Sequence, residues 1–198
     1  MLNLIIKDLL VMRKSLLFLL MYIIILPLSF IHLSGGFLPV GLFPVAVMLM
    51  NSTSNDLKNK NHVLLSSLPI RRKHIVAAKY LGALFYSLVG VVIAFVTSMV
   101  TRLAMPQTEV AWMSVGQAVM LLSLALIFSS LYLPIFYWLS DQGMQTVNIV
   151  MTIILFITLS ISFQIPVYTG SVLLLLAAIL LFLLSYFTAV RIFSRKDF

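Results

Sequence analysis

Long apolar runs alternate with short polar segments along this chain. Six of the runs are close to the roughly 20 helical residues that cross the apolar core of a bilayer. They cover residues 16–33, 37–54, 80–101, 112–139, 144–163 and 170–190. The pattern predicts an all-α, polytopic membrane protein with six transmembrane helices in a single transmembrane domain, residues 1–198. We expect the first run to be a span rather than a cleaved signal peptide, because it is too long and lacks a small-residue cleavage site.

Prolines interrupt two places in this pattern. Pro39 and Pro44 fall in the second run, so we expect its outer part to depart from a regular helix where protein or water covers the freed backbone groups. Between the last two runs, Gln164-Ile165-Pro166 breaks the helical pattern. That breaker fits a plain turn, and it equally fits a re-entrant hairpin over residues 163–169.

The composition requires lipid as the main solvent. Apolar residues make up 62% of the chain and charged residues only 9%, with a mean hydropathy of +1.15. A soluble domain has about half apolar and about a quarter charged residues. Cysteine is absent, which excludes disulfides and thiolate chemistry.

The basic residues fall almost entirely on one side of the expected spans. Twelve Lys and Arg lie at the N-terminus, between the second and third runs, and in the tail, whereas Arg102 lies on the other side. This bias places the twelve, and both termini, in the cytoplasm. The net charge of +8 therefore reflects membrane orientation, and we expect no nucleic-acid partner.

The sequence carries no signature of an enzyme. It contains neither H-E-x-x-H nor G-x-S-x-G. His32 falls near the outer face while His62 and His74 fall on the inner side, so the three histidines cannot share a metal. We expect no catalytic residues, no metal site and no cofactor bound by this chain.

The acidic residues all map to the ends of runs or to loops, and the list is Asp8, Asp56, Glu109, Asp141 and Asp197. Ion-coupled transporters generally place ionisable groups at mid-membrane. The chain also lacks the G-x-x-x-x-G-K-[ST] loop that holds nucleotide phosphates. If this protein drives transport, its energy comes from ATP bound by another polypeptide.

The longest cytoplasmic feature is the polar segment 51–80. Ser54, Asn55 or Asp56 can cap a helix there. Leu57, then Val63 or Leu64, and then Leu68 recur at helical intervals before Pro69 ends the helix. An amphipathic helix under the membrane is expected, and we favour a docking surface over a purely orienting loop, which needs only bases. Arg71, Arg72 and Lys73 follow as a basic cluster at headgroup level that orients the chain.

Two further features leave alternatives open. Residues 1–14 fit an interfacial helix and fit almost as well a simple extension of the first span. Small residues on the third run, Gly82, Ala83, Gly90 and Ala94, allow close helix packing. We favour packing within one subunit over a contact between subunits.

Several motifs resemble the membrane subunits of type-2 ABC exporters, in particular small stand-alone permeases that accompany a separate ATPase. The motifs are Asn55-Asp56, Leu64-Leu65-Ser66-Ser67-Leu68-Pro69, Arg71-Arg72-Lys73, Lys79-Tyr80-Leu81, residues 4–9 (LIIKDL), residues 133–137 (LPIFY) ahead of Gly143, and residues 195–198 (RKDF). One departure is residues 140–146, SDQGMQT, which lack the base that relatives often place near the glycine. We carry no contact role onto that loop.

The resemblance implies that residues 55–70 form a coupling helix seated in a cleft of the ATPase. Its docking residues would be Asp56, Leu57, Lys58, Leu64, Leu65, Leu68 and Pro69. The partners implied are two copies of a separate ABC ATPase, which bind ATP and Mg, and a second permease, identical or related. The location implied is the bacterial cytoplasmic membrane.

Two functional hypotheses follow for this chain. The leading one is the permease subunit of an ATP-driven exporter that moves a hydrophobic or amphipathic substrate by alternating access. A peptide toxin or antimicrobial peptide is favoured over a lipid. The alternative is a non-transporting scaffold or immunity protein that sequesters a peptide or anchors a partner. An intramembrane enzyme is disfavoured because paired catalytic groups are missing.

Overall fold

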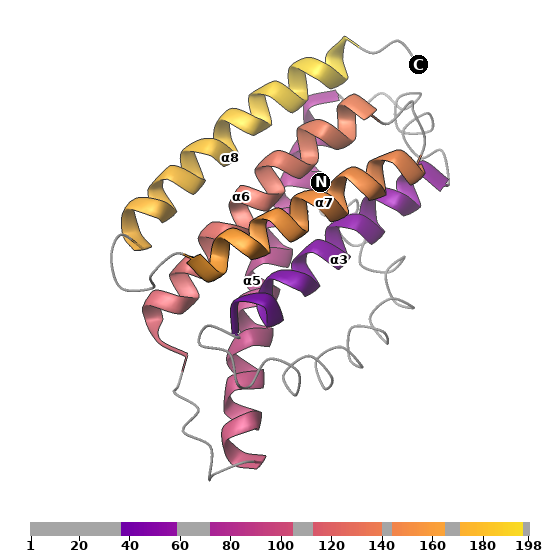
Figure 1. Ribbon diagram of the computed structural model, residues 1–198. Coiled ribbons are helices and arrows are strands. Elements are labelled where there is room, and N and C mark those ends of the chain that lie inside the picture. The colour runs from indigo at the N-terminus through magenta and orange to yellow at the C-terminus, as the bar shows by residue number, and fades with distance from the viewer. Residues whose placement is uncertain (1–36, 59–71, 105–112, 140–143, 165–170, 196–198) are drawn as a thin grey trace.

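The computed structural model describes residues 37–58, 72–104, 113–139, 144–164 and 171–195 (Figure 1). They form five helices, which are α3 (Phe37–Lys58), α5 (Arg72–Ala104), α6 (Val115–Leu139), α7 (Met144–Gln164) and α8 (Ser171–Ser194). The described part of the chain contains no strand, as predicted. The expected first span, the interfacial helix over residues 1–14 and most of the breaker at 163–169 lie outside the described residues.

Three of the described helices are long and apolar enough to cross a membrane. These segments are Arg72–Leu103, Val115–Leu139 and Val172–Ser194, and α7 adds the shorter apolar stretch Gln145–Ser160. The prediction of a polytopic helical membrane protein is therefore confirmed. The count of six spans stays a prediction.

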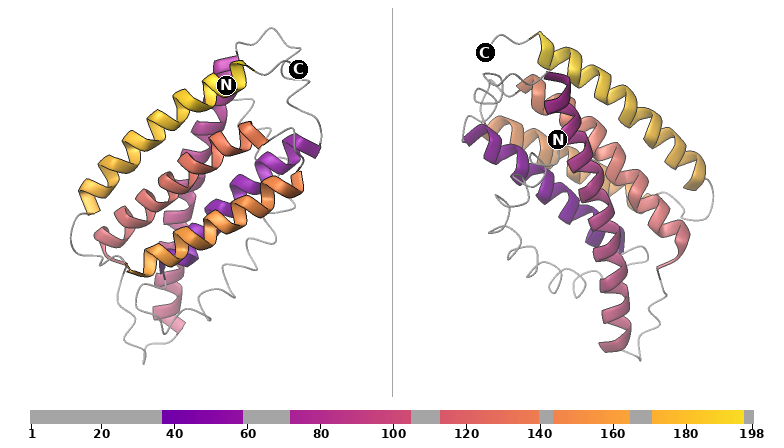
Figure 2. Two further views of the ribbon diagram at one scale, coloured as in Figure 1. Left: turned by 45° about the horizontal axis from the view of Figure 1, so that its top comes forward. Right: turned by 180° about the vertical axis from the view of Figure 1, so that it is seen from behind.

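Helix α6 is the centre of the bundle, and it packs against α3, α5, α7 and α8. Within its most apolar window 67% of the residues are buried, compared with 44% for α5 and 17% for α8. Helix α8 lies at the periphery alongside α6 (Figures 1 and 2). Its outward face carries exposed Leu173, Leu176, Leu180, Leu184 and Phe187, a surface that fits hydrocarbon and not water.

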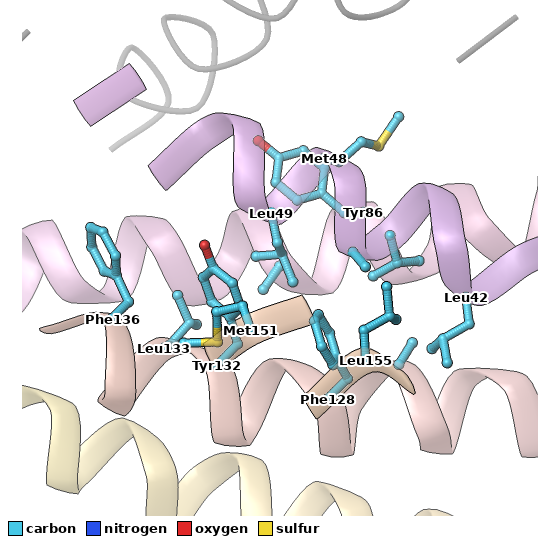
Figure 3. Packing of buried hydrophobic residues seen from close by; sticks show 14 of the residues in the cluster. Leu42, Met48, Leu49, Tyr86, Phe128, Tyr132, Leu133, Phe136, Met151 and Leu155 are labelled. Atoms are coloured by element: carbon cyan, nitrogen blue, oxygen red, sulfur yellow. The ribbon is translucent and has the colours of Figure 1, made fainter. Parts of the chain in front are cut away.

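The core is built from apolar and aromatic side chains around α6 (Figure 3). Phe128, Tyr132 and Leu133 are fully buried on α6, and Leu49 of α3 and Met151 of α7 pack in the same cluster. The rings of Tyr132 and Phe136 are stacked, with their centroids 6.4 Å apart. This cluster holds α3 and α7 against α6.

Helix α3 is continuous through Pro44, so the expectation of an irregular outer part is wrong. Pro39 falls in the first turn, where no backbone N–H is needed. Pro44 removes one helical hydrogen bond, but Val45, Ala46 and Leu49 after it are buried against the other helices. Tertiary packing therefore maintains the helix across the proline.

The backbones of α3 and α5 touch at a pair of glycines. A Cβ atom on Gly90 would lie 2.7 Å from the carbonyl oxygen of Gly41, and one on Gly41 would lie 3.0 Å from that of Gly90. Ala83 and Ala94 on the same helix are also fully buried. Gly90 therefore serves close packing within one subunit, whereas the nearest neighbour of Gly82 is Tyr86 of its own helix.

We predict that Gly90→Ala destabilises the protein and that Gly82→Ala does not. The new methyl group at 90 would meet backbone, which cannot move aside, and such overpacking typically costs about 1–3 kcal/mol. At position 82 the nearest atom is the ring of Tyr86 at 3.8 Å, an ordinary contact, and alanine favours the helix. Thermal unfolding in detergent should show a lower melting temperature for Gly90→Ala alone. Equal melting temperatures would contradict the close crossing.

Candidate functional site

Among the described residues, side-chain bonds between different helices gather at one end of the bundle. We call it the polar end, where α3, α6 and α8 finish and α5 and α7 begin. Toward the other end of α5, Thr97, Ser98 and Thr101 direct their hydroxyls to carbonyls of their own helix. The polar end is also where the undescribed segment 59–71 leaves α3 and enters α5.

Three consecutive residues of α3 contact three different helices at this end. Ser52 accepts a hydrogen bond from Lys79 Nζ of α5, at 2.7 Å. The Thr53 hydroxyl is hydrogen-bonded to the Tyr132 hydroxyl of α6, and Ser54 donates to Asn148 Oδ1 of α7 at 3.3 Å. Successive helical residues point about 100° apart, because there are 3.6 residues per turn. The final turns of α3 are therefore tied to all three neighbouring helices.

The donor in the bond between Thr53 and Tyr132 follows from local geometry. Thr53 Oγ1 also lies 2.9 Å from the Leu49 carbonyl oxygen, to which it donates its only proton. We infer that Tyr132 donates to Thr53, since a hydroxyl carries one proton and two acceptor positions. Both polar side chains are thus satisfied among apolar neighbours.

An ion pair joins α3 to α5 one turn further on. Lys79 Nζ lies 2.5 Å from Asp56 Oδ2, and the side chains are 12% and 10% exposed respectively. Because water scarcely reaches the pair, salt screens it less than a surface pair. Removing one partner of such a pair typically costs about 3–5 kcal/mol, since the other charge is left buried.

A proline explains the bond between α6 and α8. Pro134 has no backbone N–H, so the carbonyl of Ser130, four residues earlier, lacks its helical donor. Ser185 of α8 donates to that carbonyl at 2.6 Å. Tyr80 of α5 lies 2.6 Å from Ser185 Oγ, and because the Ser185 proton is already used, Tyr80 is the donor. The carbonyl that Pro134 leaves without a helical donor is therefore the start of a hydrogen-bond chain that joins α6, α8 and α5.

The first residue of α5 contacts the last residues of α8. Arg72 Nη1 donates to the carbonyl oxygens of Ser194, at 3.1 Å, and Phe193, at 3.4 Å. The last carbonyls of a helix lack intrahelical partners and carry partial negative charge. Arg72 therefore stabilises the end of α8, a role beyond membrane orientation. Lys73 is exposed, and Arg71 lies outside the described residues.

The structure divides the expected docking residues into two groups. Helix α3 extends to Lys58, so Ser54, Asn55 and Asp56 lie in its last turns and do not begin a separate helix. The physical reason is that Ser54 and Asp56 find partners on neighbouring helices, Asn148 of α7 and Lys79 of α5. Leu57 packs against the core, and Lys58 is exposed. The remaining docking candidates, Leu64, Leu65, Leu68 and Pro69, lie outside the described residues, and the docking role stays a prediction.

Sequence reasoning missed Ser52, Thr53 and Lys79 as contacts between helices. A signal was present in the run Asn51 to Asp56, six polar residues directly after fourteen mostly apolar ones. Polar side chains at a helix end inside a membrane protein generally face other helices. Which helix each one faces depends on the tertiary arrangement.

The side chains at the polar end attach one helix to another. No group of three His, Cys, Asp or Glu that could hold a metal occurs within the part of the chain that the structure describes. The polar groups described above are engaged with one another or with backbone carbonyls. The site is suited to holding helix ends in fixed relative positions.

Comparison with known families identifies this membrane bundle. A family model described as ABC-2 family transporter protein matches residues 3–194, nearly the whole chain. The chain belongs to the ABC-2 transporter family. It is therefore a permease component of an ABC transporter, and members of this family generally pair with an ABC ATPase. Comparisons with curated proteins and with solved structures give no match.

Because members of the ABC-2 family generally pair with an ABC ATPase, the contacts at the polar end can be considered together with such a partner. The polar end is the end of the bundle at which the chain leaves α3 and later enters α5, on either side of segment 59–71. At the polar end, side-chain hydrogen bonds join α3 and α5 to each other and to the three other described helices, α6, α7 and α8.

We predict that the effect of Ser185→Ala depends on Pro134. In the wild-type background the substitution leaves both the Ser130 carbonyl and the Tyr80 hydroxyl without this partner, at a cost of about 1–2 kcal/mol. Pro134→Ala restores a backbone N–H that can pair with the Ser130 carbonyl. Ser185→Ala should therefore cost less in the Pro134→Ala background.

A double-mutant cycle on melting temperature in detergent measures this coupling. Thr188→Ala serves as a control, since Thr188 lies on the same helix and its hydroxyl donates within α8, to the Ser185 carbonyl at 2.8 Å. Additive effects of Ser185→Ala and Pro134→Ala would contradict the assignment of Ser185 to the carbonyl freed by the proline.

Proposed function

We propose that this ABC-2 permease is an exporter subunit that moves a hydrophobic or amphipathic substrate by alternating access. The observation that carries the proposal is the tying of α3, α5, α6 and α7 at the polar end, on both sides of segment 59–71. A motion delivered to that segment would reach every one of these helices. Energy for uphill movement would come from the ATPase partner.

The polar end faces the cytoplasm in this proposal. The bias of twelve Lys and Arg against one supports it. Lys58, Arg72, Lys73 and Arg191 all lie at this end of the described helices, whereas Arg102 lies near the opposite end of α5. The same orientation puts both termini inside the cell, with the protein in the bacterial cytoplasmic membrane.

The composition of the described helices favours an apolar or amphipathic cargo. The described acidic residue Asp56 lies at the polar end and is paired with Lys79, so it offers no selectivity for charge at mid-membrane. Large exposed apolar surfaces on α5, α7 and α8 allow a substrate to enter from the lipid. We propose a peptide toxin or antimicrobial peptide as the cargo, with a lipid as the second choice.

The proposed assembly contains two copies of this permease, or one copy and a related permease, with two ATPase subunits. Those subunits bind ATP and Mg, and this chain binds no cofactor. Segment 59–70 would dock in a cleft of the ATPase through Leu64, Leu65, Leu68 and Pro69. Asp56 and Leu57 would support that segment from within the bundle.

We predict that the double variant Leu64→Ala/Leu65→Ala inserts normally but loses the ATPase. A fully buried leucine contributes roughly 1.5–3 kcal/mol, so the variant should weaken docking at least about ten-fold. Copurification of the ATPase from the native host measures this. Reversing the charges of Arg71, Arg72 and Lys73 is the comparison, and it should instead impair insertion or expression. Full ATPase binding by the double leucine variant would leave the segment with an orienting role alone.

We predict the orientation with single cysteines introduced into this cysteine-free chain. Cysteine at Ser66 or Ser194 should react with a membrane-impermeant maleimide only after the membrane is opened, whereas cysteine at Gln107 should react in intact cells. The reason is that, with six spans, Ser66 and Ser194 lie on the cytoplasmic side and Gln107, in the loop after the third span, lies outside. If Ser66→Cys and Gln107→Cys react from the same side, the six-span topology is wrong.

A further inference from the structure

The ion pair between Asp56 and Lys79 occupies a particular place in the chain. Asp56 lies two residues before the end of α3, and Lys79 lies in the second turn of α5. The pair therefore joins the two helices that lead into and out of segment 59–71. Ser52 adds a second contact between the same helices through Lys79 Nζ.

The geometry fixes α3 and α5 to each other at two separate points. One point is this ion pair, and the other is the backbone contact between Gly41 and Gly90. Gly41 and Asp56 are about 22 Å apart along α3, at 1.5 Å per residue. Two contacts this far apart prevent the helices from turning about either one, so α3 and α5 move as one body.

The far end of α5 projects past the neighbouring helices (Figures 1 and 2). Leu103 lies about 36 Å along the helix from Lys79, at 1.5 Å per residue. A small tilt imposed at the polar end therefore becomes a larger displacement at the opposite end of α5. Leu103 is 75% exposed, so a label at this position can report that displacement.

We infer that Asp56, Lys79 and Ser52 form a clasp that couples segment 59–71 to the α3–α5 pair. The clasp holds Lys58 and Arg72, the helix residues on either side of the segment, at a fixed separation. It makes Asp56 and Lys79 positioning residues, which transmit a docking motion without touching the ATPase or the substrate. The inference rests on the proposed function for its role in transport, but the clasp itself can be tested on the chain alone.

The first experiment measures the separation directly. Spin labels on Lys58→Cys and Lys73→Cys, both exposed in the structure, report the distance between the ends of the segment in the purified full chain in lipid nanodiscs. We expect a narrow distribution that broadens at least two-fold with Asp56→Asn or Lys79→Met. The reversed pair, Asp56→Lys with Lys79→Asp, should restore it, because the two charges still attract each other.

Ser54→Ala is the matched control for this measurement. It removes a bond from the same turn of α3, but that bond leads to Asn148 of α7, so the distribution should stay narrow. A distribution that remains narrow in both single variants, or that remains broad in the reversed pair, overturns the clasp.

The second experiment tests transmission in the complex with the ATPase that copurifies from the native host. Reactivity of Leu103→Cys with a maleimide is compared without nucleotide and after trapping with Mg-ATP and vanadate. The wild-type background should show a change of at least three-fold. Lys79→Met should bind the ATPase as wild type does yet lose this change, whereas Lys73→Met, which removes an exposed charge from the same helix, should retain it.

The two experiments separate failure of the clasp from failure of the proposed function. Loss of the nucleotide response in Lys73→Met as well as Lys79→Met, or its persistence in Lys79→Met, overturns transmission through the clasp. If no ATPase copurifies with the wild-type chain, the proposed function fails instead. The spin-label distances then still decide whether the clasp exists.

Discussion

Each polar group inside the bundle has to find its hydrogen-bond partner within the protein, because surrounding hydrocarbon offers none. The carbonyl of Ser130, freed by Pro134, meets this requirement through Ser185 of α8, which in turn accepts from Tyr80 of α5. The same requirement turns Ser52, Thr53 and Ser54 toward three different helices. The arrangement of helices at the polar end follows from satisfying these few groups.

Much of the architecture could be read from the sequence, because helix periodicity and apolar length are local properties. The apolar runs at 112–139 and 144–163 coincide with α6 and α7 to within a few residues. The role of the polar residues at 54–56 was harder to predict, since the same side chains can cap a new helix or form contacts between helices. Only the positions of Lys79 and Asn148 on other helices decide between these uses. The expectation that Pro39 and Pro44 make this helix irregular was wrong for a related reason. Burial of the turns after Pro44 maintains the helix, and burial depends on the tertiary arrangement.

The contacts at the polar end fix the ends of several helices to one another. Arg72 secures the end of α8, and the Asp56–Lys79 pair secures the junction of α3 with α5. Along the rest of the crossing between α3 and α5, backbone contact at Gly41 and Gly90 replaces polar bonds. The ion pair at the polar end and the glycine crossing further along together fix α3 and α5 to each other, so that a displacement of the polar end would be carried along both helices.

Helix α5 is longer than the hydrocarbon core of a bilayer, so its tilt depends on the thickness of the membrane. Its 33 residues extend about 50 Å at 1.5 Å per residue, whereas the hydrocarbon core is about 30 Å thick. A helix that exceeds the core is accommodated by tilting, and α5 crosses its neighbours obliquely (Figure 2). Longer or shorter acyl chains would change the preferred tilt, and α3, locked to α5, would turn with it. The lipid composition of the host membrane would thus act on the α3–α5 pair.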